Sequence, residues 1–189
     1  MSLKKILITT SIVIFALLFY VVIMFIAAFG GFNFLLRVPK PEITYGEFPC
    51  VLTYEVDGEI KTIEDTIVCE FDGFEALSEA GKYRKWKSYL KSGDEELVLL
   101  NLRDKNEVNE FGHTMLELFF YWGNAEYYMG DVDDGRSNKE QDFKWVEYKY
   151  KNAEGQIGGS AYKADEAYEK YKIRLISWEV APPIKNEFK

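Results

Sequence analysis

One uncharged stretch, Ile6 to Phe29, constrains the fold of this chain more than any other feature. It contains no proline or glycine, and its polar residues are confined to Thr9, Thr10, Ser11 and Tyr20. As an α-helix, which rises about 1.5 Å per residue, it would span about 36 Å and could cross a hydrocarbon core of about 30 Å. The stretch therefore predicts a transmembrane helix over residues 6–29.

The flanks of this stretch favour a retained anchor. Lys4 and Lys5 precede it, and Pro39 and Pro41 follow it and stop helical structure. A cleaved signal peptide is the main alternative, but its apolar region is usually about 7–15 residues long. Ile26-Ala27-Ala28 is also a poor cleavage site because Ile is bulky. A buried helix of a soluble protein is the third alternative.

The distribution of basic residues predicts the orientation. The N-terminal flank holds two lysines and the terminal amine, whereas the other flank holds Arg37 and Lys40. The positive-inside rule then favours a cytoplasmic N-terminus. We expect residues 1–5 in the cytoplasm, a membrane-proximal linker over 30–41, and an extracytoplasmic domain over 42–189 of a single-pass cell-membrane protein.

Charge excludes one class of partner. The whole chain carries -8, and residues 1–41 carry +4, so the remaining domain carries -8 minus 4, or -12. Such a domain is repelled by nucleic acid, and we expect no nucleic-acid partner. The expected partners are membrane lipid around residues 6–29 and a glycan or protein of the cell envelope. Solubility alone is a sufficient reason for the acidic surface.

The domain is predicted to be α+β, β-rich and mostly antiparallel, a sheet or sandwich with one short helix near its C-terminus. That helix is Lys163–Tyr171, where Ala164, Ala167, Tyr168 and Tyr171 have helical spacing. His113–Trp122 is apolar on both faces and predicts a central strand. Phe71–Gly81 reads as a loop. The other expected strands are 95–103, 125–129, 142–151, 156–162 and 173–180, together with 83–90, for which a helix is the alternative.

Three hairpins can be given a register. Asp57-Gly58 is a strong two-residue turn, so Val56 should pair with Glu59. A turn at Gly123-Asn124 would place Phe120 opposite Tyr127. A four-residue turn over Asn152–Gly155 would place Trp145 opposite Tyr162.

The first register bears on the two cysteines. It places Cys50 opposite Asp65 and Cys69 opposite Gly46, four residues apart along the sheet. At about 3.3 Å per residue that is about 13 Å, whereas disulfide Cα atoms lie within about 7 Å. We expect two separate buried thiols; a bulge near Glu64-Asp65 would leave the bridge open as an alternative.

Candidate catalytic and metal-binding residues are few. His113 is the only histidine and lies in no catalytic motif. Asp131, Asp133 and Asp134 lie in a segment similar to a calcium loop, but Gly135 and Arg136 depart from the EF-hand pattern. A solvated loop is the alternative to weak cation binding. No cofactor is expected, and no carboxylate spacing singles out an acid–base pair.

The remaining candidate site is an aromatic pair, Trp145 and Tyr162, predicted to touch on a polar sheet face. Such a pair can be a stacking platform for a glycan or a partner side chain, or simply a strand stabiliser. Together with the predicted anchor, it favours a non-catalytic binding or assembly module at a cell envelope. The alternative is an envelope enzyme that uses loop carboxylates such as Asp131 and Asp133.

Overall fold

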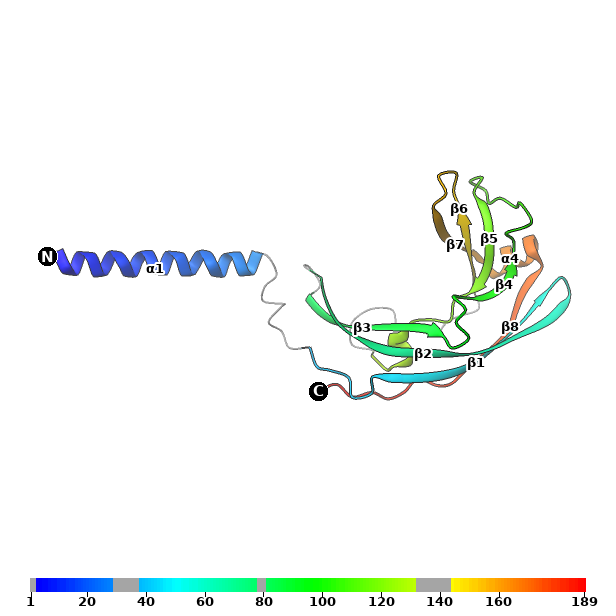
Figure 1. The fold of residues 1–189 in the computed structure, drawn as a ribbon, viewed down its shortest axis with the longest axis horizontal. Coiled ribbons are helices and arrows are strands. Elements are labelled where there is room, and N and C mark those ends of the chain that lie inside the picture. The colour runs from blue at the N-terminus through cyan, green and yellow to red at the C-terminus, as the bar shows by residue number, and fades with distance from the viewer. Residues whose placement is uncertain (1–2, 29–37, 78–80, 132–143) are drawn as a thin grey trace. The chain divides into compact units, whose positions relative to one another are not determined.

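A computed structural model describes residues 3–28, 38–77, 81–131 and 144–189. Within these ranges it describes only the backbone of residues 3–7, 9, 26–28, 76, 77 and 81. This part is β-rich, with two four-stranded antiparallel sheets and few helices (Figure 1). Two compact units are present: residues 1–40, 72–85 and 189, and residues 41–71 and 86–188. The helices are α1 (Leu3–Ala28), α3 (Ala125–Tyr128) and α4 (Ala164–Tyr171). The strands are β1 (Tyr45–Val56), β2 (Glu59–Leu77), β3 (Gly81–Leu90), β4 (Leu97–Asn101), β5 (Thr114–Phe120), β6 (Trp145–Lys151), β7 (Ile157–Lys163) and β8 (Ile173–Val180).

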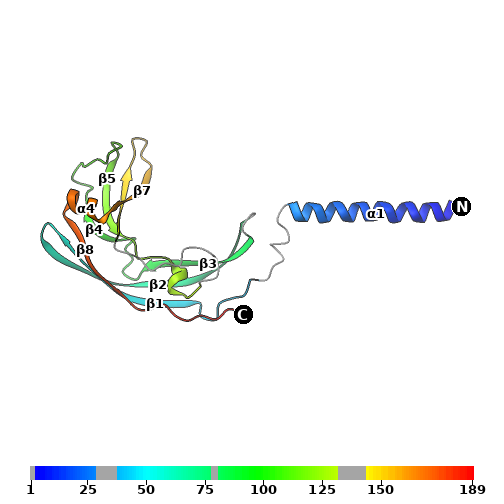
Figure 2. The same cartoon turned by 180° about the vertical axis from the view of Figure 1, so that it is seen from behind.

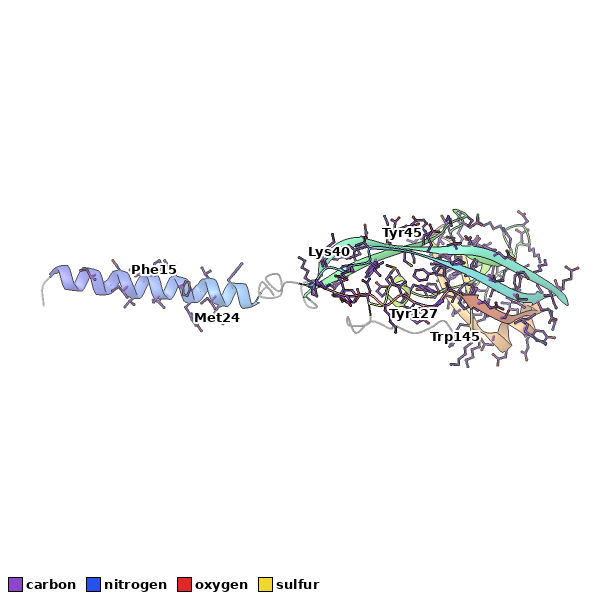
Figure 3. The ribbon with its side chains drawn as sticks, turned by 90° about the horizontal axis from the view of Figure 1, so that it is seen from below. Phe15, Met24, Lys40, Tyr45, Tyr127 and Trp145 are labelled. Carbon is purple, nitrogen blue, oxygen red and sulfur yellow. The ribbon has the colours of Figure 1, made fainter. Side chains whose placement is uncertain are left out.

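Helix α1 is continuous from Leu3 to Ala28, and after Lys5 it contains no charged residue. Its large side chains are exposed, and Figure 3 shows Phe15 and Met24 projecting from it. Among the residues that the structure describes, no helix meets the length and hydropathy required of a membrane span. The transmembrane helix stays a prediction.

The first sheet has the order β3-β2-β1-β8. Asp57 and Gly58 both adopt positive φ, at 52° and 82°, as a tight hairpin turn between β1 and β2 requires. The predicted register is confirmed without a shift from Val56 opposite Glu59 to Tyr45 opposite Glu70. The predicted loop over Phe71–Gly81 is wrong in part, because β2 continues to Leu77.

The same register determines how far apart Cys50 and Cys69 lie. Cys50 lies opposite Asp65 and Cys69 opposite Gly46, as expected. Both thiols are buried and unbridged, which confirms two separate cysteines. Burial raises the pKa of Cys50 to about 11 and that of Cys69 to about 12, so both remain neutral thiols at physiological pH.

The second sheet has the order β4-β5-β6-β7. β5 has a strand on each side, which confirms that the apolar stretch His113–Trp122 supplies a central strand, here Thr114–Phe120. Leu118 and Phe120 are fully buried on one of its faces. They join Leu52 and Ile67 of the first sheet in one hydrophobic core.

The hairpin predicted at Gly123-Asn124 is wrong. The chain forms the short helix α3 instead, and Phe120 pairs with Leu97 of β4 rather than with Tyr127. Ala125, Tyr128 and Met129 are buried, and this spacing of three and four residues is helical. Burying that single face outweighs the alternation that a strand would need.

The register predicted for the β6–β7 hairpin is wrong by one residue. The loop contains five residues, Asn152 to Gln156, because both the backbone and the side chain of Asn152 form hydrogen bonds that close it. Its Oδ1 accepts hydrogen bonds from the backbone N–H of Glu154 (3.0 Å) and of Gln156 (2.8 Å). Trp145 consequently pairs with Lys163, and Tyr162 pairs with Val146. A shift of one residue places Trp145 and Tyr162 on opposite faces of the sheet.

The predicted soluble helix is confirmed as α4. Ala167 and Tyr171 are its buried residues, and the Glu166 carboxylate accepts a hydrogen bond from the Lys163 backbone N–H at 3.0 Å. Lys172, with a φ of 55°, ends the helix in the left-handed conformation. The chain then continues directly into β8, which pairs with β1.

Candidate functional site

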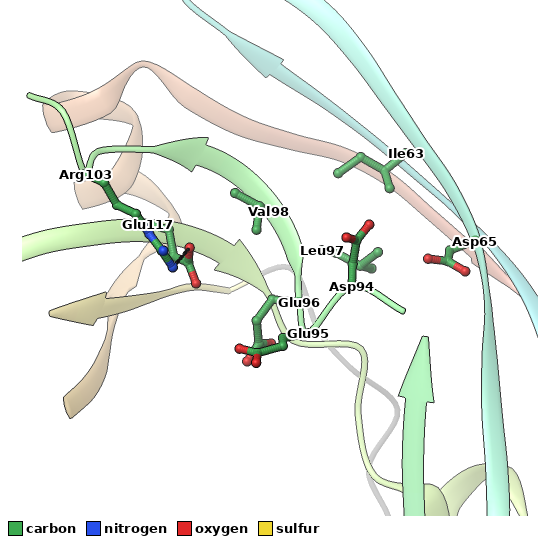
Figure 4. Close-up of a pocket in the computed structure, with 9 residues that line it drawn as sticks. All are labelled: Ile63, Asp65, Asp94, Glu95, Glu96, Leu97, Val98, Arg103 and Glu117. Carbon is green, nitrogen blue, oxygen red and sulfur yellow. Dashed lines mark hydrogen bonds and ion pairs between the residues drawn. The ribbon is translucent and has the colours of Figure 1, made fainter. Parts of the chain in front are cut away.

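A charged cavity of about 580 Å³ lies between β2 and the β4–β5 part of the second sheet. Figure 4 shows Asp65 extending from β2 toward Asp94, and Arg103 beside Glu117. The lining residues are Ile63, Asp65, Asp94, Glu95, Glu96, Leu97, Val98, Arg103 and Glu117. Five of these nine side chains are carboxylates, so the cavity is strongly acidic.

Asp65 holds one wall of the cavity together. Its carboxylate accepts hydrogen bonds from the backbone N–H of Thr66 (2.6 Å) and from the hydroxyl of Ser92 (2.6 Å). Ser92 Oγ in turn accepts a hydrogen bond from the backbone N–H of Asp94 at 3.1 Å. Asp65 is therefore a structural residue that fixes the β3–β4 turn against β2.

Lys149 of β6 organises the other wall. Its ammonium lies 3.0 Å from Glu96 Oε1, 3.4 Å from Glu117 Oε1 and 3.6 Å from Glu95 Oε2. Glu117 also accepts from Arg103 at 3.1 Å, and its side chain is only 8% exposed. These ion pairs form one connected network on the face of the second sheet that is opposite the core.

The network shifts two ionisation equilibria. Burial by itself lowers the pKa of Lys149, but hydrogen bonds and charge from Glu96 and Glu117 outweigh it and raise this pKa. On the same strand, burial and then the charge of Glu96 raise the pKa of the Glu147 carboxyl. The protein thus holds Lys149 cationic and disfavours a further negative charge at Glu147.

The chemistry available here is electrostatic. Five carboxylates face two cations, Arg103 and Lys149, which leaves three negative charges in excess. The cavity therefore attracts cationic groups. Asp65 and Glu117 are already engaged by structural partners, and the described residues contain no cluster of three metal-binding side chains.

The sequence singled out none of these network residues. One signal could have found the site: Glu117 is the only charged residue in the apolar strand stretch 113–122. A carboxylate there must find cations, because burying it unpaired is costly. Lys149 and Glu96 come from distant segments, and only the sheet brings them to Glu117.

The predicted cation loop is described only at its first residue. Asp131 is fully buried and accepts a hydrogen bond from the Trp86 indole N–H at 2.8 Å. Asp133 and Asp134 lie outside the described residues. Cation binding by this loop stays a prediction, although Asp131 has a structural partner inside the core.

The predicted aromatic pair does not form. Tyr162 stacks on Tyr148 with ring centroids 4.5 Å apart and accepts a hydrogen bond from Lys170 Nζ at 3.0 Å. Trp145, on the other face, is 43% exposed and borders a hollow of about 430 Å³ with Lys144, Lys163, Ala164 and Asp165. The two residues therefore cannot share one stacking surface, and a binding role for either residue stays a prediction.

His113 immediately precedes β5 and stacks on Tyr150, with ring centroids 4.8 Å apart. Its backbone N–H donates to Asn109 Oδ1 at 3.0 Å. His113 does not line the charged cavity. This placement agrees with a packing role at the end of a strand.

Comparison with protein families, characterised proteins and solved structures finds no match to this chain.

Proposed function

We propose that this protein is a single-pass, membrane-anchored module that binds or assembles at a cell envelope, with its β-rich domain on the extracytoplasmic side. The observation that carries the proposal is the apolar surface of α1. Its large side chains between Ile8 and Phe25 are each exposed by 40% or more. A helix that is apolar on all sides needs an apolar environment, and lipid around residues 6–29 would supply it.

The β-rich domain supports a binding role more than a catalytic one. Asp65 and Glu117 are engaged in structural bonds, and Asp131 is buried and accepts a hydrogen bond from Trp86. These three carboxylates are therefore poor candidates for proton transfer, which needs a group within hydrogen-bond reach of a substrate. Trp145 keeps an exposed ring beside a hollow, and we assign the contact with a glycan or a partner side chain to it.

Alkaline extraction and cysteine labelling test the anchor and its orientation. The full chain should stay in the membrane pellet after treatment with alkaline carbonate. Because Cys50 and Cys69 are buried, a Glu154→Cys variant offers one exposed thiol at a turn. A membrane-impermeant maleimide should label it on intact cells, whereas Ser2→Cys should react only after permeabilisation. Release by carbonate would refute the anchor, and the reverse labelling pattern would refute the orientation.

A pair of variants tests the binding assignment. Trp145→Ala should reduce co-sedimentation of the protein with isolated envelope glycan without lowering the melting temperature, because Trp145 is exposed. Tyr162→Ala removes a stacked ring from the side of the core and should lower the melting temperature. If Trp145→Ala binds the glycan as wild type does, or destabilises the domain as Tyr162→Ala does, the assignment is wrong.

A further inference from the structure

The two sheets have four outer strands, and three of them carry features that discourage pairing with another strand. β3 contains Lys82, Lys85 and Lys87. β8 contains Arg174 and Glu179 and has an irregular register with β1. β4 is five residues long and irregular against β5. Charges, short length and bulges are the usual protections of a sheet edge.

β7 has none of these protections over most of its length. Its sequence from Ile157 to Tyr162 contains no charge and no proline, and its register with β6 is regular throughout. Among the described strands it is the outermost of the second sheet on the side of β6, in both views of the fold (Figures 1 and 2). Ile157 is 69% exposed, and Gly159 and Ser160 are exposed beside it.

The hydrogen-bond pattern shows which residues of β7 face outward. The Ala164 N–H donates to Lys144 O, and the Asn152 N–H donates to Gln156 O, so even-numbered residues of β7 bond to β6. An antiparallel ladder alternates every second residue. The backbone N–H and C=O groups of Ile157, Gly159 and Ala161 therefore point away from β6, and within the described residues no strand pairs with them.

We propose that this edge pairs antiparallel with β7 of a second copy of the chain, about a two-fold axis at Gly159. Ile157 of each copy then faces Ala161 of the other, so the exposed isoleucine is covered. Lys163, at the other end of β7, then lies near the loop over Asn152–Gln156 of the other copy, which carries Glu154 of opposite charge. The four-stranded second sheet of one copy then joins the second sheet of the other copy in one continuous sheet of eight strands, which is a form of β-strand addition.

The small side chains of β7 suit this contact but limit its strength. Three outward residues per copy cover far less than the roughly 1,200–2,000 Å² of a stable interface. Confinement of both copies to one membrane would raise their effective concentration, and only this step rests on the proposed anchor. We therefore expect dimers in membranes and mostly monomers in dilute detergent solution.

Disulfide trapping in membranes tests the pairing with the full chain. A Cβ added at Gly159 meets nothing closer than Tyr148 O at 3.5 Å, so Gly159→Cys should fold normally. Directly opposed Cα atoms in a hydrogen-bonded pair lie about 5.5 Å apart, within the range of a disulfide. Mild oxidation should link Gly159→Cys into a dimer. Ile157→Cys alone should not link, because it lies about 13 Å from its own copy, whereas Ile157→Cys with Ala161→Cys should.

Two controls make the result decisive. Glu154→Cys is exposed but far from its own copy in this register, so equal linking there would mean random collision and would overturn the pairing. In the Ile157→Cys, Ala161→Cys background, Gly159→Lys places like charges opposite each other and should lower linking about fivefold. Absence of linking in membranes that retain the protein after carbonate treatment would overturn the pairing and leave the anchor standing. Linking of a chain that carbonate releases from the membrane would support the pairing and refute the anchor.

Discussion

At the scale of single residues, Glu117 shows how this domain handles a charge inside an apolar strand. Its side chain is almost fully covered, and two cations, from Arg103 and from Lys149 of β6, lie within 3.4 Å of its oxygens. Removing one partner of such a group leaves a buried charge less well compensated. The cost falls on the neighbours too, since Lys149 also serves Glu96.

The raised pKa of Glu147 should be visible in the pH dependence of the free energy of unfolding. Its pKa is raised above the ordinary 4.5 by burial and by Glu96, so the folded state binds this proton more tightly than the unfolded chain. Its stabilising contribution is present at low pH and is lost as the pH rises through the raised pKa. Glu147→Gln should therefore be more stable than wild type near pH 7, and the difference should shrink toward pH 4.5. Urea unfolding of both proteins at the two pH values measures it; a difference that does not change with pH would contradict the assignment.

Phe120 should be among the most costly side chains to truncate. It is fully buried, and its ring lies 5.1 Å from that of Trp178 on the first sheet. Phe120→Ala removes these contacts and leaves a cavity, so it should lower the free energy of unfolding by about 3–5 kcal/mol. Phe111→Ala, at a ring that is 71% exposed, is the matched control and should change it by less than about 0.5 kcal/mol. Equal costs in a denaturant titration would refute this view of the core.

At the scale of elements, the C-terminal segment after β8 fastens the short helix α3. The Ile184 N–H donates to Tyr128 O at 2.9 Å, and Asn186 Nδ2 donates to Met129 O at 3.2 Å. Four residues cannot hold a helix by themselves. This contact between distant parts of the chain explains how α3 persists where the sequence alone favoured a strand.

Gly130, directly after α3, makes that contact close enough to test. Its φ is 64°, and an added Cβ would lie 2.4 Å from Ile184 O. Gly130→Ala should therefore force the backbones apart and cost about 1–3 kcal/mol beyond the strain of a positive φ. Gly112→Ala has a similar φ of 76° with open space around it, so it isolates the strain alone. Thermal melts of the two variants that coincide would contradict the close approach.

At the scale of the whole molecule, the segment before the first sheet is hydrogen-bonded to the C-terminal residue. Lys40 and Lys189 exchange two backbone hydrogen bonds of 2.8 and 3.0 Å. Arg84 also donates to Pro39 O at 3.4 Å. The boundary at Glu42 stays a prediction, and these bonds lead us to expect that Pro39 and Lys40 also contribute to the folded part.

Two truncated chains test this boundary. A chain beginning at Val38 keeps these bonds and should melt cooperatively without α1. A chain beginning at Glu42 loses both backbone bonds, each worth about 0.5–1.5 kcal/mol, and should melt at a lower temperature. Differential scanning calorimetry compares the two. Identical melting temperatures would support the boundary at Glu42, and aggregation of both chains without a cooperative transition would contradict a self-sufficient domain.

Local patterns were enough to predict the β-rich antiparallel class, the helix α4 and the β1–β2 register. Asp57-Gly58 favours a two-residue turn, and the alternation of β1 then fixes the pairing of every residue of β1 with β2. The same turn logic separated Cys50 from Cys69. Each of these features depends on residues that are neighbours in sequence.

Only the tertiary structure decided the features that depend on distant partners. α3 is a helix because its buried face and the crossing C-terminal segment outweigh a strand pattern. The β6–β7 loop holds five residues because the Asn152 side chain closes it, and that one residue separates Trp145 from Tyr162. The charged network joins Glu96, Glu117 and Lys149 only through the pairing of three strands, since charges act through space and carry no periodic signal in the chain.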